Sequence, residues 1–145
     1  MSVPLAVFFD IGDTLARPVV TGGRLMGLRP YPFVTDVLQQ MEGADLSLGL
    51  ISNTGTETAQ SLRDLLEDAE LLPFFRGHML LFSSVEGLDK SDPAFFELAR
   101  DRAGVPAARC LFVGESEAER AVAKGVGFRV SPHPLHALDL VREDP

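Results

Sequence analysis

Cysteine, tryptophan and basic residues are scarce in this chain of 145 residues. Cys110 has no second cysteine to pair with, so an internal disulfide is excluded and the fold does not depend on an oxidising compartment. Lys and Arg number 13 against 21 Asp and Glu, which gives a formal net charge of −8. This balance disfavours binding to nucleic acid or to an anionic membrane, because both need clustered positive charge. It is compatible with a bound cation.

Long hydrophobic runs are also missing. No apolar stretch approaches the roughly 18 residues of a membrane-spanning helix. The first residues contain a short apolar run without a basic leader before it, so we expect a soluble, cytoplasmic protein. The length is close to that of one hydrophobic core, and we expect residues 1–145 to form a single domain.

Short apolar segments recur along the chain, and each is followed by a small or polar turn. A stretch with helical spacing of apolar residues comes next in most cases. This alternation predicts an α/β fold, with helices on both faces of a parallel sheet of about five strands. The predicted strands cover residues 5–9, 46–51, 79–82, 110–113 and 128–130.

The intervening segments are predicted to be helical, with one exception. Helices are expected at residues 33–41, 57–68, 117–124 and 135–141, and after the N-cap Asp92. The exception is the stretch 17–32, which holds three prolines and three glycines. We expect it to be a loop, because both residue types interrupt regular structure.

Polar side chains follow the predicted strands at their carboxyl ends, where open parallel sheets bind their ligands. Together they offer two carboxylates, one ammonium group and several hydroxyl and amide donors. Carboxylates and backbone carbonyls suit Mg²⁺, and the ion with a lysine would offset the charge of a phosphoryl group. A carboxylate could then attack that group. These residues are Asp10, Ser52, Asn53, Thr54, Lys90, Glu115 and Ser116.

Four segments resemble the sequence motifs of the haloacid dehalogenase (HAD) superfamily, in that family's order. They are VFFDIGDTL at 7–15, LGLISNT at 48–54, GLDKSDPAFFELA at 87–99 and CLFVGESEAERAVAKGVGF at 110–128. The first is similar to the family's hydrophobic strand followed by Asp-x-Asp-x-Thr. The resemblance implies a three-layer Rossmann-like, HAD-like core. The segments before and after the second motif are too short for a cap domain, so we expect a cap-less core.

The resemblance also implies residue roles. Asp10 would be the nucleophile that forms an aspartyl-phosphate, Ser52 would donate to a phosphoryl oxygen, and Lys90 would neutralise charge. The Mg²⁺ ligands would be Asp10, the backbone carbonyl of Gly12, and Glu115 in place of the family's usual Asp. Asn53 and Glu119 are supporting candidates around this set, with Glu119 at the second acidic position of the fourth motif.

Three positions depart from the family pattern: Gly12, Glu115 and Ser91, which replaces the proline that usually follows the lysine of the third motif. Gly12 stands where the family's phosphatases carry the Asp that serves as acid and base, a role that contributes about 10²–10⁴-fold to rate. Asp13 is the nearest replacement, although a shift of one residue generally reverses the direction of a side chain. Asp13 can equally be a turn acceptor.

Two functions remain open on these grounds. The first is a Mg²⁺-dependent phosphohydrolase of low activity that acts on a phosphorylated substrate. Such a substrate would be large, or a second subunit of a homo-oligomer would close the site, because no cap is expected. The alternative is a catalytically impaired binding or regulatory module that keeps the fold and the metal. A phospho-acceptor domain of the response-regulator kind, or a dehalogenase, fits less well.

Overall fold

Five of the strands form one parallel sheet in the order β5-β4-β1-β6-β7. The computed structural model describes residues 4–142. Each predicted apolar segment corresponds to one of these strands, which confirms the expected α/β fold. They are β1 (Ala6–Phe9), β4 (Ser47–Ser52), β5 (Leu80–Phe82), β6 (Cys110–Val113) and β7 (Arg129–Ser131).

Strands β1, β5 and β6 are apolar throughout because helices cover both faces of the sheet. In β1 the side chains alternate between two cores: Val7 and Phe9 belong to one, and Ala6 and Phe8 to the other. Every residue of β1 and β6 is buried. The apolar runs therefore follow from a three-layer arrangement.

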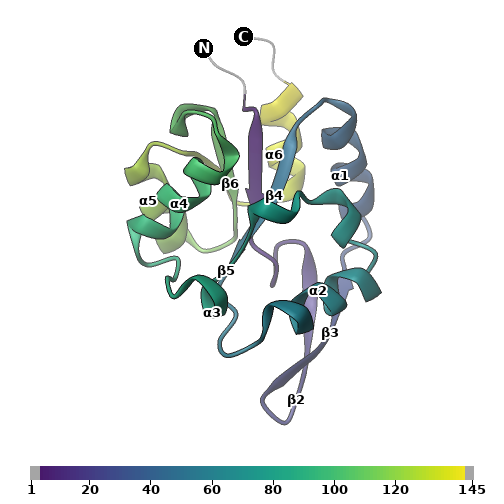
Figure 1. Cartoon of the computed structure of the whole chain (residues 1–145). Helices are drawn as coiled ribbons and strands as arrows, with labels where there is room; N and C mark the ends of the chain where they lie inside the picture. Colours follow the sequence, from purple (N-terminus) through teal and green to yellow (C-terminus); the bar gives the residue numbers. More distant parts are fainter. Residues whose placement is uncertain (1–3, 143–145) are drawn as a thin grey trace.

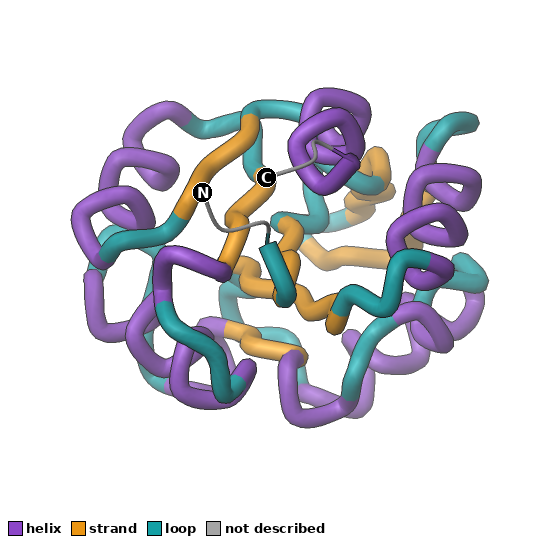
Figure 2. Tube along the Cα trace, turned by 90° about the horizontal axis from the view of Figure 1, so that it is seen from above, coloured by secondary structure: helices purple, strands orange, loops and turns teal. Residues whose placement is uncertain are grey.

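Two groups of helices form the outer layers (Figures 1 and 2). The core that contains Val7 and Phe9 also takes side chains from α1 (Val34–Gly43), α2 (Ala59–Asp68) and α6 (Pro134–Arg142). The opposite core takes them from α4 (Pro93–Ala103) and α5 (Glu117–Val126). The predicted helices are thus present. The helices of the described residues are too short or too polar to span a bilayer.

The region after β1 differs from the prediction. Residues 17–32 do not form a loop: β2 (Ala16–Thr21) and β3 (Arg24–Pro30) make an antiparallel hairpin. Gly22 and Gly23 form its turn with φ values of 59° and 77°. Positive φ at both central residues is what a tight hairpin turn requires, and glycine adopts it without steric cost. The run Val19-Val20-Thr21 before this Gly-Gly pair was the signal for a hairpin.

Short elements fill the remaining connections. They are the 3₁₀ turns η1 (Leu72–Phe74), η2 (Gly77–Met79) and η3 (Ala107–Arg109), and the one-turn helix α3 (Ser83–Glu86). The last lies in a segment that the sequence suggested was a loop. No separate cap domain lies within residues 4–142, because the segments after β1 and β4 hold only the hairpin, α1, α2 and these turns.

The carboxyl ends of β1, β4 and β6 meet at one edge of the sheet. Phe9 pairs with Leu50 on one side and with Val113 on the other, so Asp10 emerges between two neighbouring strands. A Cβ at position 114 would lie 3.6 Å from the Cβ of Asp10 and only 2.7 Å from the Phe112 ring. Glycine is therefore needed where β6 ends beside β1.

Candidate active site

The Asp10 carboxylate is contacted by hydrogen-bond donors from three separate segments. Its Oδ1 accepts hydrogen bonds from the backbone N–H of Ile11 at 2.8 Å and from Ser52 Oγ at 3.3 Å. The Nζ of Lys90 lies 2.8 Å from the same oxygen. The backbone N–H of Asp10 donates to the Val113 carbonyl at 2.9 Å, which ties the residue to β6. The structure thus brings together Asp10, Ser52 and Lys90, as the strand-end argument predicts.

Lys90 is buried, with 2% of its surface exposed, and lies between two carboxylates. Its Nζ is 2.9 Å from Glu119 Oε1 in α5, in addition to the contact with Asp10. The ammonium group also lies 5.9 Å from the centre of the Phe112 ring. A buried charge is costly unless it is paired, so these neighbours explain how a lysine is accommodated here.

The loop that carries Lys90 is anchored to the end of β4. Asn53 Oδ1 accepts the backbone N–H of Lys90 at 3.0 Å. Thr54 Oγ1 lies 2.7 Å from Ser84 Oγ, and the Thr54 N–H donates to Ser83 Oγ at 2.8 Å. Asn53 therefore orients the lysine loop through its backbone and makes no direct contact with Asp10 among the interactions of the described residues.

Ser91 stabilises a turn next to Lys90. Its backbone N–H and its hydroxyl both donate to Asp89 Oδ1. These hydrogen bonds, the hydroxyl's first, hold the pKa of Asp89 below its usual value. Asp92 then caps α4 by accepting the N–H of Ala94 at 2.9 Å. These hydrogen bonds thus order the loop, although Ser91 replaces the proline of the third family motif.

The turn after Asp10 contains both Gly12 and Asp13. The carbonyl of Ile11 accepts the N–H groups of Thr14, Leu15 and Ala16, so the chain reverses directly after β1. Asp13 has φ of 61°, a left-handed conformation that Asp tolerates, and its side chain is exposed. No interaction within residues 4–142 joins the Asp13 side chain to Asp10.

The acidic residues after β6 have different environments. Ser116 caps α5 by accepting the N–H of Glu119 at 3.3 Å, and Arg120 donates to the Gly114 carbonyl at 2.8 Å. This geometry directs Glu119 to Lys90, whereas Glu115 is exposed. Glu119 thus contacts the lysine, and Glu115 makes no ion pair with it in the described part of the chain.

The donors around Asp10 are compatible with a magnesium ion. Gly12 O accepts no hydrogen bond within residues 4–142, and the contacts of the Asp10 carboxylate all involve Oδ1. Glu115 adds a second carboxylate directly after Gly114. No cluster of three or more His, Cys, Asp or Glu side chains forms a ready metal cage in the described chain. The set therefore suits an ion that keeps several water ligands, as Mg²⁺ does.

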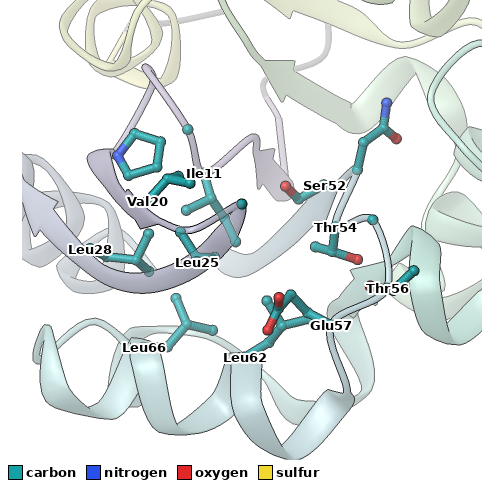
Figure 3. Close-up of a pocket in the computed structure, with 15 residues that line it drawn as sticks. Ile11, Val20, Leu25, Leu28, Ser52, Thr54, Thr56, Glu57, Leu62 and Leu66 are labelled. Atoms are coloured by element: carbon teal, nitrogen blue, oxygen red, sulfur yellow. The ribbon is translucent and has the colours of Figure 1, made fainter.

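A pocket of about 400 Å³ opens beside these residues (Figure 3). Ile11, Gly12 and Ser52 form the end nearest to Asp10. The hairpin forms one wall and α2 the other. This pocket has no signal in the sequence, because one of its walls is the hairpin in a segment that was expected to be a loop. Its remaining lining residues are Pro18, Val20, Gly23, Leu25, Leu28, Asn53, Thr54, Gly55, Thr56, Glu57, Leu62 and Leu66.

Comparisons with known proteins agree with the sequence motifs. The family model for haloacid dehalogenase-like hydrolases matches residues 22–127. A phosphoglycolate phosphatase of Pseudomonas savastanoi pv. phaseolicola is 31% identical over 97 residues, which covers 67% of this chain and 34% of that protein. An (S)-2-haloacid dehalogenase 2 of a Pseudomonas species is 28% identical over 105 residues, covering 72% of this chain and 44% of that one. The chain thus spans a third to under half of these relatives.

A solved structure extends the likeness to nearly the whole chain. A HAD-superfamily hydrolase from Ehrlichia chaffeensis matches with a TM-score of 0.75 and covers 97% of both chains. Its sequence identity is 12%, so this comparison shows a shared fold alone. The fold of this chain therefore occurs in another protein of similar length.

Proposed function

This chain belongs to the haloacid dehalogenase-like hydrolase family, and from that premise we propose that it is a Mg²⁺-dependent phosphohydrolase acting through Asp10. The observation that carries the proposal is the buried contact of 2.8 Å between Asp10 Oδ1 and Lys90 Nζ. A buried lysine paired with a strand-end carboxylate places positive charge where a phosphoryl group would add negative charge. The phosphatase among the relatives supports a phosphorylated substrate.

The proposed reaction has two steps. A carboxylate oxygen of Asp10 attacks the phosphorus of a phosphate monoester, and the ester oxygen leaves with the electrons of the broken P–O bond. Water then attacks the phosphorus of the aspartyl-phosphate, which releases phosphate and restores the carboxylate. Ser52 donates a hydrogen bond to a phosphoryl oxygen. Lys90 offsets the charge shared by Asp10 and the phosphoryl group.

We assign the magnesium ligands to the Asp10 carboxylate, the Gly12 carbonyl and the Glu115 carboxylate. When bound, the ion would neutralise charge on the phosphoryl oxygens and orient the group for attack. Glu119 stays with Lys90 in this assignment, since its Oε1 lies 2.9 Å from the lysine Nζ. Asn53 keeps the lysine loop in place.

Protonation of the leaving group is the weak step of this reaction. Gly12 has no side chain to supply the proton, and the exposed side chain of Asp13 makes no contact with Asp10 in the described part of the chain. Loss of general acid–base catalysis costs about 10²–10⁴-fold in rate. We therefore propose slow turnover, with the proton supplied by water for most substrates.

A second function is favoured by two observations. Gly12 lacks the acid and Glu115 is exposed, so the fold could bind a phosphorylated ligand at Asp10 without hydrolysing it. Such a chain would be a binding or regulatory module. In both cases we propose that residues 1–145 act as one core domain.

Hydrolysis of p-nitrophenyl phosphate in the presence and absence of Mg²⁺ separates the two functions. The phosphohydrolase releases nitrophenol only with Mg²⁺, and Asp10→Asn removes the activity. Asp36→Asn, the same change at an exposed position in the first turn of α1, serves as the control. Equal background rates for wild type and Asp10→Asn would overturn the enzyme function and leave the binding module.

A further inference from the structure

We propose that the pocket between the hairpin and α2 binds the uncharged, apolar ester group of the substrate. This inference rests on the proposed phosphohydrolase function and adds the chemical class of the leaving group. The pocket volume of about 400 Å³ lies in the range of about 300–1,000 Å³ typical of small-ligand sites.

The position of the pocket connects it with the reacting atoms. Ser52 lines the pocket and its Oγ lies 3.3 Å from Asp10 Oδ1. Gly12 lines it too, and a Cβ at that position would approach only Pro18 Cγ, at 3.5 Å. A phosphoryl group held at Asp10 and Ser52 therefore lies next to this space, and we place its ester group there.

The walls of the pocket are mostly hydrocarbon. Leu62 and Leu66 from α2 face Leu25, Leu28 and Val20 from the hairpin in Figure 3. Burial of apolar surface against such walls is favourable, at about 0.8 kcal/mol for each methylene group. An alkyl or aryl group would gain from this contact, whereas a strongly hydrated group would lose its water.

The charge of the pocket disfavours substrates that carry a second carboxylate. Glu57 is the charged residue among its lining residues, and no lysine, arginine or histidine is part of that set in the described chain. Glu57 Oε1 accepts a hydrogen bond from Ser61 Oγ at 3.1 Å. A second carboxylate in the substrate would meet Glu57 without a cationic partner. The pocket therefore does not suit phosphoglycolate, the substrate in the name of the Pseudomonas relatives.

The hairpin supplies a matched pair of variants. Val20 and Met26 are similarly exposed, at 60% and 61%, and both lie in the hairpin. Only Val20 lines the pocket. Val20→Asp introduces charge into the proposed binding site, and Met26→Asp introduces the same charge elsewhere on the hairpin.

The experiment compares n-hexyl phosphate with ethyl phosphate, whose leaving groups are both simple alkoxides. We expect kcat/KM for the hexyl ester to be about 10- to 100-fold higher in wild type, from the added methylene burial. Met26→Asp should keep this ratio and Val20→Asp should reduce it to a few-fold. Because the ratio is taken within each variant, a general effect of the new charge on phosphate binding cancels.

Calorimetric binding of hexylphosphonate and ethylphosphonate distinguishes the two ways in which the account can fail. Hydrolysis without a chain-length preference overturns the pocket assignment and leaves the phosphohydrolase standing. A second outcome is that the protein shows no turnover, but binds hexylphosphonate more tightly than ethylphosphonate, and Val20→Asp abolishes this preference. That outcome supports the pocket and overturns the phosphohydrolase. A dimer in sedimentation that Val20→Asp dissociates, together with no hexylphosphonate binding, would overturn the pocket as a substrate site.

Discussion

The Nζ of Lys90 lies 2.8 Å from Oδ1 of Asp10, so the loop before α4 contacts the residue that follows β1. The lysine is buried and also reaches Glu119 in α5. Three segments distant in sequence therefore share one buried charge network. Because a buried network of this kind depends on each partner, removal of one carboxylate should affect both stability and turnover.

Glu119→Gln tests this network. The substitution keeps the size of the side chain and removes the negative charge that faces Lys90. We expect the free energy of unfolding to fall by about 1–3 kcal/mol, and phosphatase turnover to fall because Lys90 is held less firmly. Denaturant titration and p-nitrophenyl phosphate hydrolysis measure the two effects. Glu117→Gln, at an exposed position in the first turn of the same helix, is the matched control. Identical behaviour of the two variants would contradict the role of Glu119.

Gly12→Asp should raise turnover. The backbone at Gly12 has no positive φ, and a Cβ there would meet only Pro18 Cγ at ordinary contact distance, 3.5 Å. The new carboxyl group faces the pocket and can protonate the ester oxygen, which is worth about 10²-fold or more. Steady-state rates with an alkyl phosphate measure the gain, since alkoxides need protonation most. Gly12→Asn is the control without an acidic proton, and an equal gain in both variants would rule out acid catalysis as the cause.

Glu115→Gln should weaken magnesium binding without disturbing the fold. Glu115 is exposed, so the unfolding free energy should stay within about 0.5 kcal/mol of wild type. The Mg²⁺ concentration for half-maximal turnover should rise, because a neutral amide replaces an anionic ligand. Magnesium titration of the rate measures this shift. An unchanged magnesium dependence would assign the ion to other ligands.

Cys110 should be unreactive in the folded protein. Burial raises the pKa of its thiol from the ordinary 9.0 to about 11, opposed in part by Arg100. At pH 8 Ellman's reagent should therefore react only after unfolding. The unfolded chain releases the thiol proton first, so the unfolding free energy should fall as the pH rises from 9 toward 11. Cys110→Ala should show a smaller fall over that pH range, and rapid labelling of the native protein would contradict the burial.

The parallel sheet was predictable because its strands are buried on both faces. Residues such as Val7, Phe8 and Phe9 form a continuous apolar run for that reason. The edge position of Asp10, Ser52 and Lys90 followed from the rule that parallel strands present their carboxyl ends together. Their distances depended on packing between segments, which no local pattern specifies.

The hairpin was missed because the prolines and glycines of residues 17–32 were weighed by number rather than by position. Pro18 lies in the first half of β2 and Pro30 ends β3, where a two-stranded ribbon tolerates a missing N–H. Without the hairpin, the apolar face of α2 had no visible partner near Asp10. The pocket was therefore not predictable from the sequence, although the spacing of Leu62 and Leu66 had already indicated the apolar face of α2.

The most direct test of the account is the site of phosphoryl transfer. An acid quench during turnover of an aryl phosphate, followed by peptide mass spectrometry, should find one phosphoryl group on the peptide that contains Asp10. The label should disappear on longer incubation after substrate is exhausted, and Asp10→Asn should carry none. Turnover with no label on Asp10, or with the label on another residue, would contradict the central claim that Asp10 is the nucleophile.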